Sequence, residues 1–189
     1  MGYSTDFSGY AEFNKPLPKE LCDYINGFAH RRHVTRDVNI IKKMDPFWKD
    51  HCFKGDLGPE GMYYLVPLTL REEQVNTSIP AGLYGKQKDG LYNNIFGQLV
   101  DKSVINDNIP PKDCPSLWCQ WIISDNGTLE WDGGEKFYEY IPWLEFLIKH
   151  FFAPDGYILN GSIQWQGDDS DDYGTIDLTN NIVTAHPYE

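Results

Sequence analysis

The alternation of apolar and polar residues along the chain predicts an antiparallel sheet. In residues 3–13, one face of an extended strand collects Tyr3, Thr5, Phe7, Gly9, Ala11 and Phe13. In residues 157–166, one face collects Tyr157, Leu159, Gly161, Ile163 and Trp165, and the intervening positions are mostly polar. A period of two with one apolar face is typical of a strand that is buried on one side and wet on the other. We therefore expect two long strands in such a sheet.

Shorter strands flank two turn signals in the C-terminal half. Residues 117–123 and 128–131 lie on either side of Asp125-Asn126-Gly127, and Asn and Gly both tolerate the positive φ that tight turns require. Residues 175–179 and 182–185 lie on either side of Asn180-Asn181. These patterns predict two hairpins.

Residues 62–68 predict one further strand earlier in the chain. Its Pro67 indicates an edge position, because proline has no N–H to donate to a neighbouring strand.

Two segments have helical spacing. The first helix is expected to begin at Pro18 or Lys19 and to end near the basic residues 30–33, with an apolar stripe of Leu21, Tyr24, Ile25 and Phe28. The second is expected over residues 141–152, with Pro142 at its start, and to end at residues 154–156. The apolar stripe of each helix must be buried away from water, and the apolar face of the predicted sheet is the surface available for it to pack against. The predicted fold class is therefore α+β: an antiparallel sheet with two main helices packed on one face.

The length of 189 residues favours one globular domain over residues 1–189. Residues 37–60 and 70–116 are rich in Gly, Pro, Asn and Asp and are interpreted as irregular insertions. A connection as long as the second one is uncommon without structure of its own. We expect short strands, helical turns or an ordered functional loop there.

The net charge of −12 is concentrated in residues 117–189, which contain 13 Asp and Glu against 2 Lys and Arg. Phosphate contacts need cations, so this charge argues against direct nucleic-acid binding and favours a basic protein partner. No apolar run reaches the roughly 20 residues of a membrane helix, and the first residues lack a secretory signal. The four cysteines form no Cys-x-x-Cys pair. We expect a cytoplasmic protein with reduced thiols and no membrane association.

Two acidic groups are candidates for a functional site: Glu130, Asp132, Glu135 and Glu139, and Asp168, Asp169, Asp171 and Asp172. The first group could perform acid–base chemistry or hold magnesium, but acidic residues are also common at the start of a helix. The second suggests calcium, yet Tyr173 and Asn180 stand where an EF-hand loop needs ligands. We interpret both groups as an acidic face for a partner and expect no catalytic residue, metal or cofactor.

Arg31, Arg32 and Arg36 form the one dense cationic patch. Arginine forms bidentate bonds with phosphate and carboxylate, so the three residues are candidates for binding an anion. They could equally pair with carboxylates of this chain, or complement the C-terminal end of the first helix. All three interpretations stay open at the level of sequence.

Several motifs resemble those of a group of bacterial and bacteriophage proteins without an established activity. They are Leu117-Trp118-Cys119-Gln120-Trp121, the segment EWDGGEKFY at residues 130–138, the opening GYST followed by Pro16-Leu17, and LNG followed by WQG at residues 159–167. The resemblance covers most of the chain. It implies a bacterial or phage cytoplasmic setting and an origin in a mobile element, and it carries over no catalytic residue.

Three functional hypotheses follow. The favoured one is an acidic, non-enzymatic binding protein, encoded by a phage or mobile element, that occupies a basic, nucleic-acid-binding surface of a host or defence protein. The alternative is a binder of, or an enzyme acting on, a small phosphorylated ligand held by Arg31, Arg32 and Arg36. The third is a structural or assembly protein.

Overall fold

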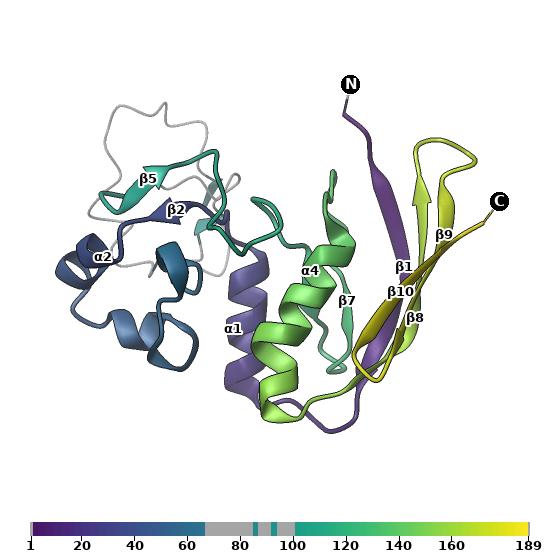
Figure 1. Cartoon of the computed structure of the whole chain (residues 1–189), viewed down its shortest axis with the longest axis horizontal. Helices are drawn as coiled ribbons and strands as arrows, with labels where there is room; N and C mark the ends of the chain where they lie inside the picture. Colours follow the sequence, from purple (N-terminus) through teal and green to yellow (C-terminus); the bar gives the residue numbers. More distant parts are fainter. Residues whose placement is uncertain (1, 67–84, 87–91, 94–100, 189) are drawn as a thin grey trace. The chain divides into compact units, whose positions relative to one another are not determined.

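The computed structural model describes residues 2–66, 85–86, 92–93 and 101–188. The chain forms two compact units (Figure 1). Unit 1 comprises Met1–His30 and Trp118–Glu189, and unit 2 comprises Arg31–Leu117. The single domain expected from chain length stays a prediction.

Unit 1 is built on a six-stranded antiparallel sheet with strand order β10-β9-β8-β1-β7-β6. The strands are β1 (Thr5–Phe13), β6 (Trp121–Ile123), β7 (Leu129–Trp131), β8 (Leu159–Gly167), β9 (Tyr173–Thr179) and β10 (Ile182–Pro187). β1 and β8 pair along their whole length, from Thr5 opposite Gly167 to Phe13 opposite Leu159. The antiparallel sheet predicted from the alternation is therefore confirmed.

The predicted apolar face of the sheet is the buried one. Its fully buried side chains include Ala11, Leu129, Leu159, Ile163 and Ile176. The intervening positions of β1 and β8 are exposed. Burial of one face fixes the register, because a slip by one residue would move every apolar side chain into water.

The two predicted hairpins form, with their turns at the expected residues. Asn180 and Asn181 have φ of 51° and 68° between β9 and β10. Two successive left-handed residues match the right-handed twist of the flanking strands. Gly127 has φ of 78° in the turn between β6 and β7. β6 is shorter than the predicted strand 117–123, since the strand begins only at Trp121.

Helices α1 (Lys19–Ala29) and α4 (Tyr140–Leu147) cover the buried face of the sheet (Figure 1). α4 continues through a wider turn, η4 (Ile148–Phe152), and a tight turn, η5 (Ala153–Asp155). The Phe28 ring of α1 lies 5.9 Å from Phe146 of α4, and Phe7 of β1 lies 4.8 Å from Tyr140. Two main helices packed on one face, as predicted, thus complete the α+β fold.

Unit 2 contains shorter elements. They are β2 (Thr35–Arg36) paired with β5 (Val104–Asn106), β3 (Gly85–Lys86) paired with β4 (Tyr92–Asn93), α2 (Val38–Met44), and the turns η1 (Trp48–His51), η2 (Phe53–Gly55) and η3 (Pro59–Gly61). The Asp37 side chain caps α2 by accepting hydrogen bonds from the N–H groups of Asn39 and Ile40. A core of Ile41, Cys52, Leu57, Tyr64 and Val66 joins α2 to the turns.

The strand predicted at residues 62–68 is wrong over the part that the structure describes. Residues 62–66 follow a turn in which Tyr64 N–H donates to the Gly61 carbonyl, and Gly61 has φ of 73°. Met62, Tyr64 and Val66 are buried at alternate positions, which explains the strand-like pattern. They pack into the unit 2 core without pairing as a strand, and residues 67 and 68 lie outside the described residues.

Candidate functional site

The face of the sheet opposite the helices, called the outer face below, presents polar side chains from neighbouring strands. Pairing places Tyr10 opposite Ser162 and Ser162 opposite Asp177, so one row crosses β1, β8 and β9. The outer face consists of Asp6, Ser8, Tyr10, Glu12, Ile122, Glu130, Asn160, Ser162, Gln164, Gln166, Tyr173, Thr175, Asp177, Thr179, Ile182, Thr184 and His186.

The outer face is acidic. Its carboxylates are Asp6, Glu12, Glu130 and Asp177, and none of the strand positions on this face holds Lys or Arg. Asp177 accepts a hydrogen bond of 2.8 Å from Ser162 and lies 3.5 Å from His186. Tyr10 is 51% exposed among these side chains. The face therefore combines negative charge with hydroxyl and amide groups.

The charge of the whole chain resides in the unit that carries this face. Unit 1 contains 17 Asp and Glu against 4 Lys and Arg, a net charge of −13. Unit 2 contains 11 against 12, a net charge of +1. The acidic character seen in the sequence is thus a property of unit 1.

Two of the four aspartates that the sequence suggested for an acidic face, at residues 168–172, hold their loop in place. Asp168 accepts a 2.7 Å hydrogen bond from the Ser4 N–H. Asp172 accepts one from the Trp165 indole at 3.1 Å and another from the Tyr3 hydroxyl. The Asp169 and Asp171 side chains are exposed. The loop between β8 and β9 is thereby fastened to the start of β1.

The four candidate carboxylates at residues 130–139 do not converge on one site. Glu130 lies on the outer face, whereas Asp132 accepts a 2.7 Å hydrogen bond from the Gly134 N–H within its own turn. Glu135 and Glu139 are exposed. Over the described residues, no group of three or more His, Cys, Asp or Glu side chains could hold a metal ion.

Asp132 gives a prediction about pH and stability. Burial raises the pKa of this carboxyl above its ordinary value of 3.8, despite the hydrogen bond from Gly134. The folded state therefore disfavours the charged form, and stability is lost as pH rises through the range above 3.8. Asp132→Asn keeps an acceptor for Gly134. It should raise the free energy of unfolding at pH 7, and the gain should disappear below pH 3.8.

Urea unfolding at pH 3.5 and pH 7 checks this expectation. Exposed Glu135→Gln is the matched control, and its stability should follow that of the wild type at both pH values. An Asp132→Asn variant less stable than the wild type at pH 7 would contradict the argument.

The three predicted arginines are all engaged within unit 2 and do not converge. Arg31 donates to the Val66 carbonyl at 2.7 Å, and Arg32 donates to the Asp107 carbonyl and the Asn108 side chain, both at 2.9 Å. Arg36 is buried and pairs with buried Asp101. The internal pairing left open by the sequence thus exists for Arg36.

A second buried polar group of unit 2 centres on Asp45. Its carboxylate accepts hydrogen bonds from the Tyr64 hydroxyl and the Phe47 N–H, both at 2.9 Å, and lies 2.7 Å from His51 Nδ1. Burial, with the hydrogen bond to Asp45, raises the pKa of Tyr64. This group has no signature in the sequence, because its members are spread over 20 residues without a motif. Its bonds join α2 to the turns that follow.

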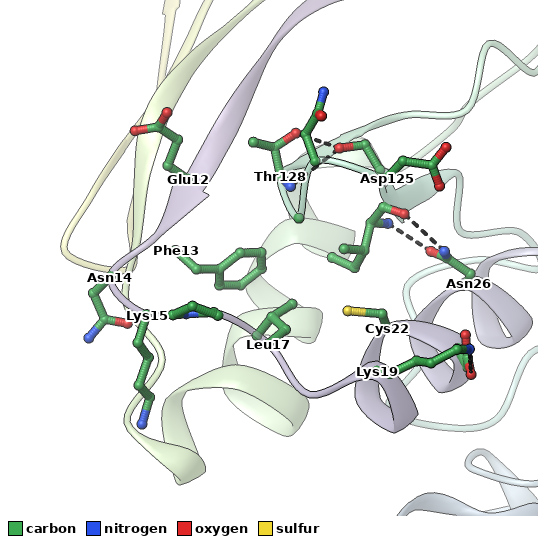
Figure 2. A pocket seen from close by; sticks show the side chains of 16 residues that line it. Glu12, Phe13, Asn14, Lys15, Leu17, Lys19, Cys22, Asn26, Asp125 and Thr128 are labelled. Carbon is green, nitrogen blue, oxygen red and sulfur yellow. Dashed lines mark hydrogen bonds and ion pairs between the residues drawn. The ribbon is translucent and has the colours of Figure 1, made fainter.

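A groove of about 680 Å³ lies in unit 1 between the β1–α1 connection and the β6–β7 turn (Figure 2). Its Asn26 side chain donates to the Ile123 carbonyl at 2.9 Å and accepts from the Ile123 N–H at 2.7 Å. Lys19 pairs with Asp23. Burial raises the pKa of the Cys22 thiol, so the thiolate that would act as a nucleophile is disfavoured. The Asn26 amide of this groove is used by the fold, and we take the outer face as the stronger candidate.

The fold and the outer face define an α+β protein with an open, acidic sheet. Comparisons of the chain with protein-family models, curated proteins and solved structures found no match. None of the described helices is long and apolar enough to cross a membrane.

Proposed function

We propose that this chain is a non-enzymatic binding protein whose outer face occupies a basic, nucleic-acid-binding surface of another protein. The supporting observation is the set of four carboxylates on the outer face, at strand positions that include no Lys or Arg. In the bacterial or phage setting that the sequence resemblance implies, the partner is a host or defence protein in the cytoplasm.

The charge distribution supports this proposal physically. Surfaces that bind nucleic acid carry Lys and Arg for the phosphates, and an acidic surface complements the same groups. A net charge of −13 on unit 1 would speed the encounter and make it sensitive to salt. Exposed Tyr10 adds a residue type that is enriched in protein interfaces.

Capture from nuclease-treated bacterial lysate tests the proposal. Immobilised wild-type protein should retain basic proteins at low salt and release them at high salt or on addition of double-stranded DNA. The double variant Glu12→Lys/Asp177→Lys should lose about tenfold or more of this capture, because each reversed charge repels the partner.

The control variant changes the net charge equally but away from the sheet. Glu20→Lys/Glu145→Lys alters exposed residues of α1 and α4 and should retain most of the capture. Equal losses in the two double variants would show that net charge alone acts. If the captured proteins were not released by double-stranded DNA, the proposed competition with nucleic acid would be contradicted.

A further inference from the structure

The outer face contains a hollow of about 370 Å³ at the end where β1, β8 and β9 meet. Strand pairing places Asp6 opposite Gln166 and Gln166 opposite Tyr173. Tyr188 follows β10 and donates its N–H to the Tyr173 carbonyl at 3.0 Å. The hollow thus has a carboxylate on one side and two tyrosines on the other.

The Gln166 side chain, which lies on β8 between Asp6 and Tyr173, points toward the next loop. Gln166 Nε2 donates to the carbonyls of Gly167 and Asp169, both at 3.1 Å, so its amide lies toward the loop at residues 168–172. Asp6 and Tyr173 stand on strands separated by β8, which places their backbones about 9.5 Å apart. The hollow lies between these two strands, with β8 beneath it.

The aromatic wall is held in place before any partner arrives. The Tyr173 and Tyr188 rings lie 5.3 Å apart with 34° between their planes. The Tyr188 hydroxyl shares a 2.6 Å hydrogen bond with Thr175. These contacts restrain both rings, and a restrained side chain loses less entropy on binding.

We propose that this hollow receives an arginine side chain of the basic partner. The planar guanidinium stacks on the tyrosine rings and donates to the Asp6 carboxylate. A guanidinium uses both interactions, whereas an ammonium group lacks the flat surface for stacking. The volume suits one long side chain. This inference rests on the proposed function and adds a preference for arginine over lysine.

Fluorescence anisotropy with labelled hexa-arginine and hexalysine peptides tests the preference. Wild-type protein should bind hexa-arginine more tightly. Asp6→Asn and Tyr188→Ala should each weaken hexa-arginine binding about fivefold or more, and hexalysine binding less than twofold. Glu12→Gln, a carboxylate of the same strand and face outside the hollow, should weaken both peptides equally. Tyr188→Phe keeps the ring and loses only the hydroxyl bond to Thr175, so it should bind hexa-arginine more tightly than Tyr188→Ala does, which separates stacking from loss of fold.

A second measurement locates the site directly. Titration of methylguanidinium into ¹⁵N-labelled protein should shift the backbone amides of Gln166, Tyr173 and Gly174, and methylammonium should shift them much less. The arginine site would be overturned if Asp6→Asn and Tyr188→Ala weakened the binding of both peptides equally, or if both small cations shifted the amides equally. The proposed function of the acidic outer face would not be contradicted by that result. Binding of neither peptide at low salt would contradict the proposed function itself.

Discussion

Replacing Phe28 by alanine should lower the free energy of unfolding by about 3–5 kcal/mol. Phe28 is fully buried where α1 meets α4. Its ring lies 5.1 Å from Phe151, 5.9 Å from Phe146 and 6.0 Å from Trp143. Truncation removes these contacts together and leaves a cavity that the surrounding rings cannot fill. Urea unfolding followed by tryptophan fluorescence measures the change.

Two further variants define what a smaller effect would mean. Phe28→Leu retains most of the volume and should cost less than Phe28→Ala. Ile182→Ala removes an apolar side chain that is 66% exposed on β10 and should cost under about 1 kcal/mol. A loss below about 1 kcal/mol for Phe28→Ala would contradict the packing of α1 against α4.

Replacing Arg36 by methionine should destabilise unit 2 by about 3–5 kcal/mol. Arg36 pairs with Asp101 and donates to Ser103 Oγ at 2.8 Å, and all three residues are buried. Methionine fills much of the space but leaves the Asp101 carboxylate buried without its cation. Amide hydrogen exchange at Val104, whose N–H donates to the Asp101 carbonyl, reports the local change.

A second substitution separates the lost pair from lost packing. In Arg36→Met/Asp101→Asn the buried charge is removed as well, so stability should recover in part. Lys43→Met, an exposed residue of α2, should change stability by under about 0.5 kcal/mol. If Arg36→Met changed the stability no more than Lys43→Met does, the buried Arg36–Asp101 pair would have no role in holding unit 2 together.

The sequence predicted those elements whose signal is local. β1 and β8 follow from a period of two over nine residues each, and the β9–β10 hairpin follows from Asn180-Asn181. α2 was missed because its seven residues are too few for a helical period, although Asp37 is a recognisable cap. The pairing of β1 with β8 joins segments about 150 residues apart. No local pattern carries that information.

The candidate site was predicted less well for the same reason. Local density of acidic residues identified residues 130–139 and 168–172, but of the eight carboxylates only Glu130 lies on the outer face. Asp6, Glu12 and Asp177 belong to two strands, and only the strand order brings them to one surface. Their side of the strand, however, was implicit in the alternation, since they occupy its polar positions. Similarly, the partner of Arg36 is Asp101, 65 residues away.

The amide of Asn26 also limits how the sheet can grow. An open sheet has two edges with exposed peptide groups, and edge-to-edge templating is a common route to fibres. At the β6 edge, Asn26 occupies both the N–H and the carbonyl of Ile123, and β6 is only three residues long. β10 is the other edge strand of this sheet, and Pro187 at its end has no N–H to donate to a further strand. Because Asn26 already bonds both peptide groups of Ile123, a strand added at the β6 edge would have to displace this side chain.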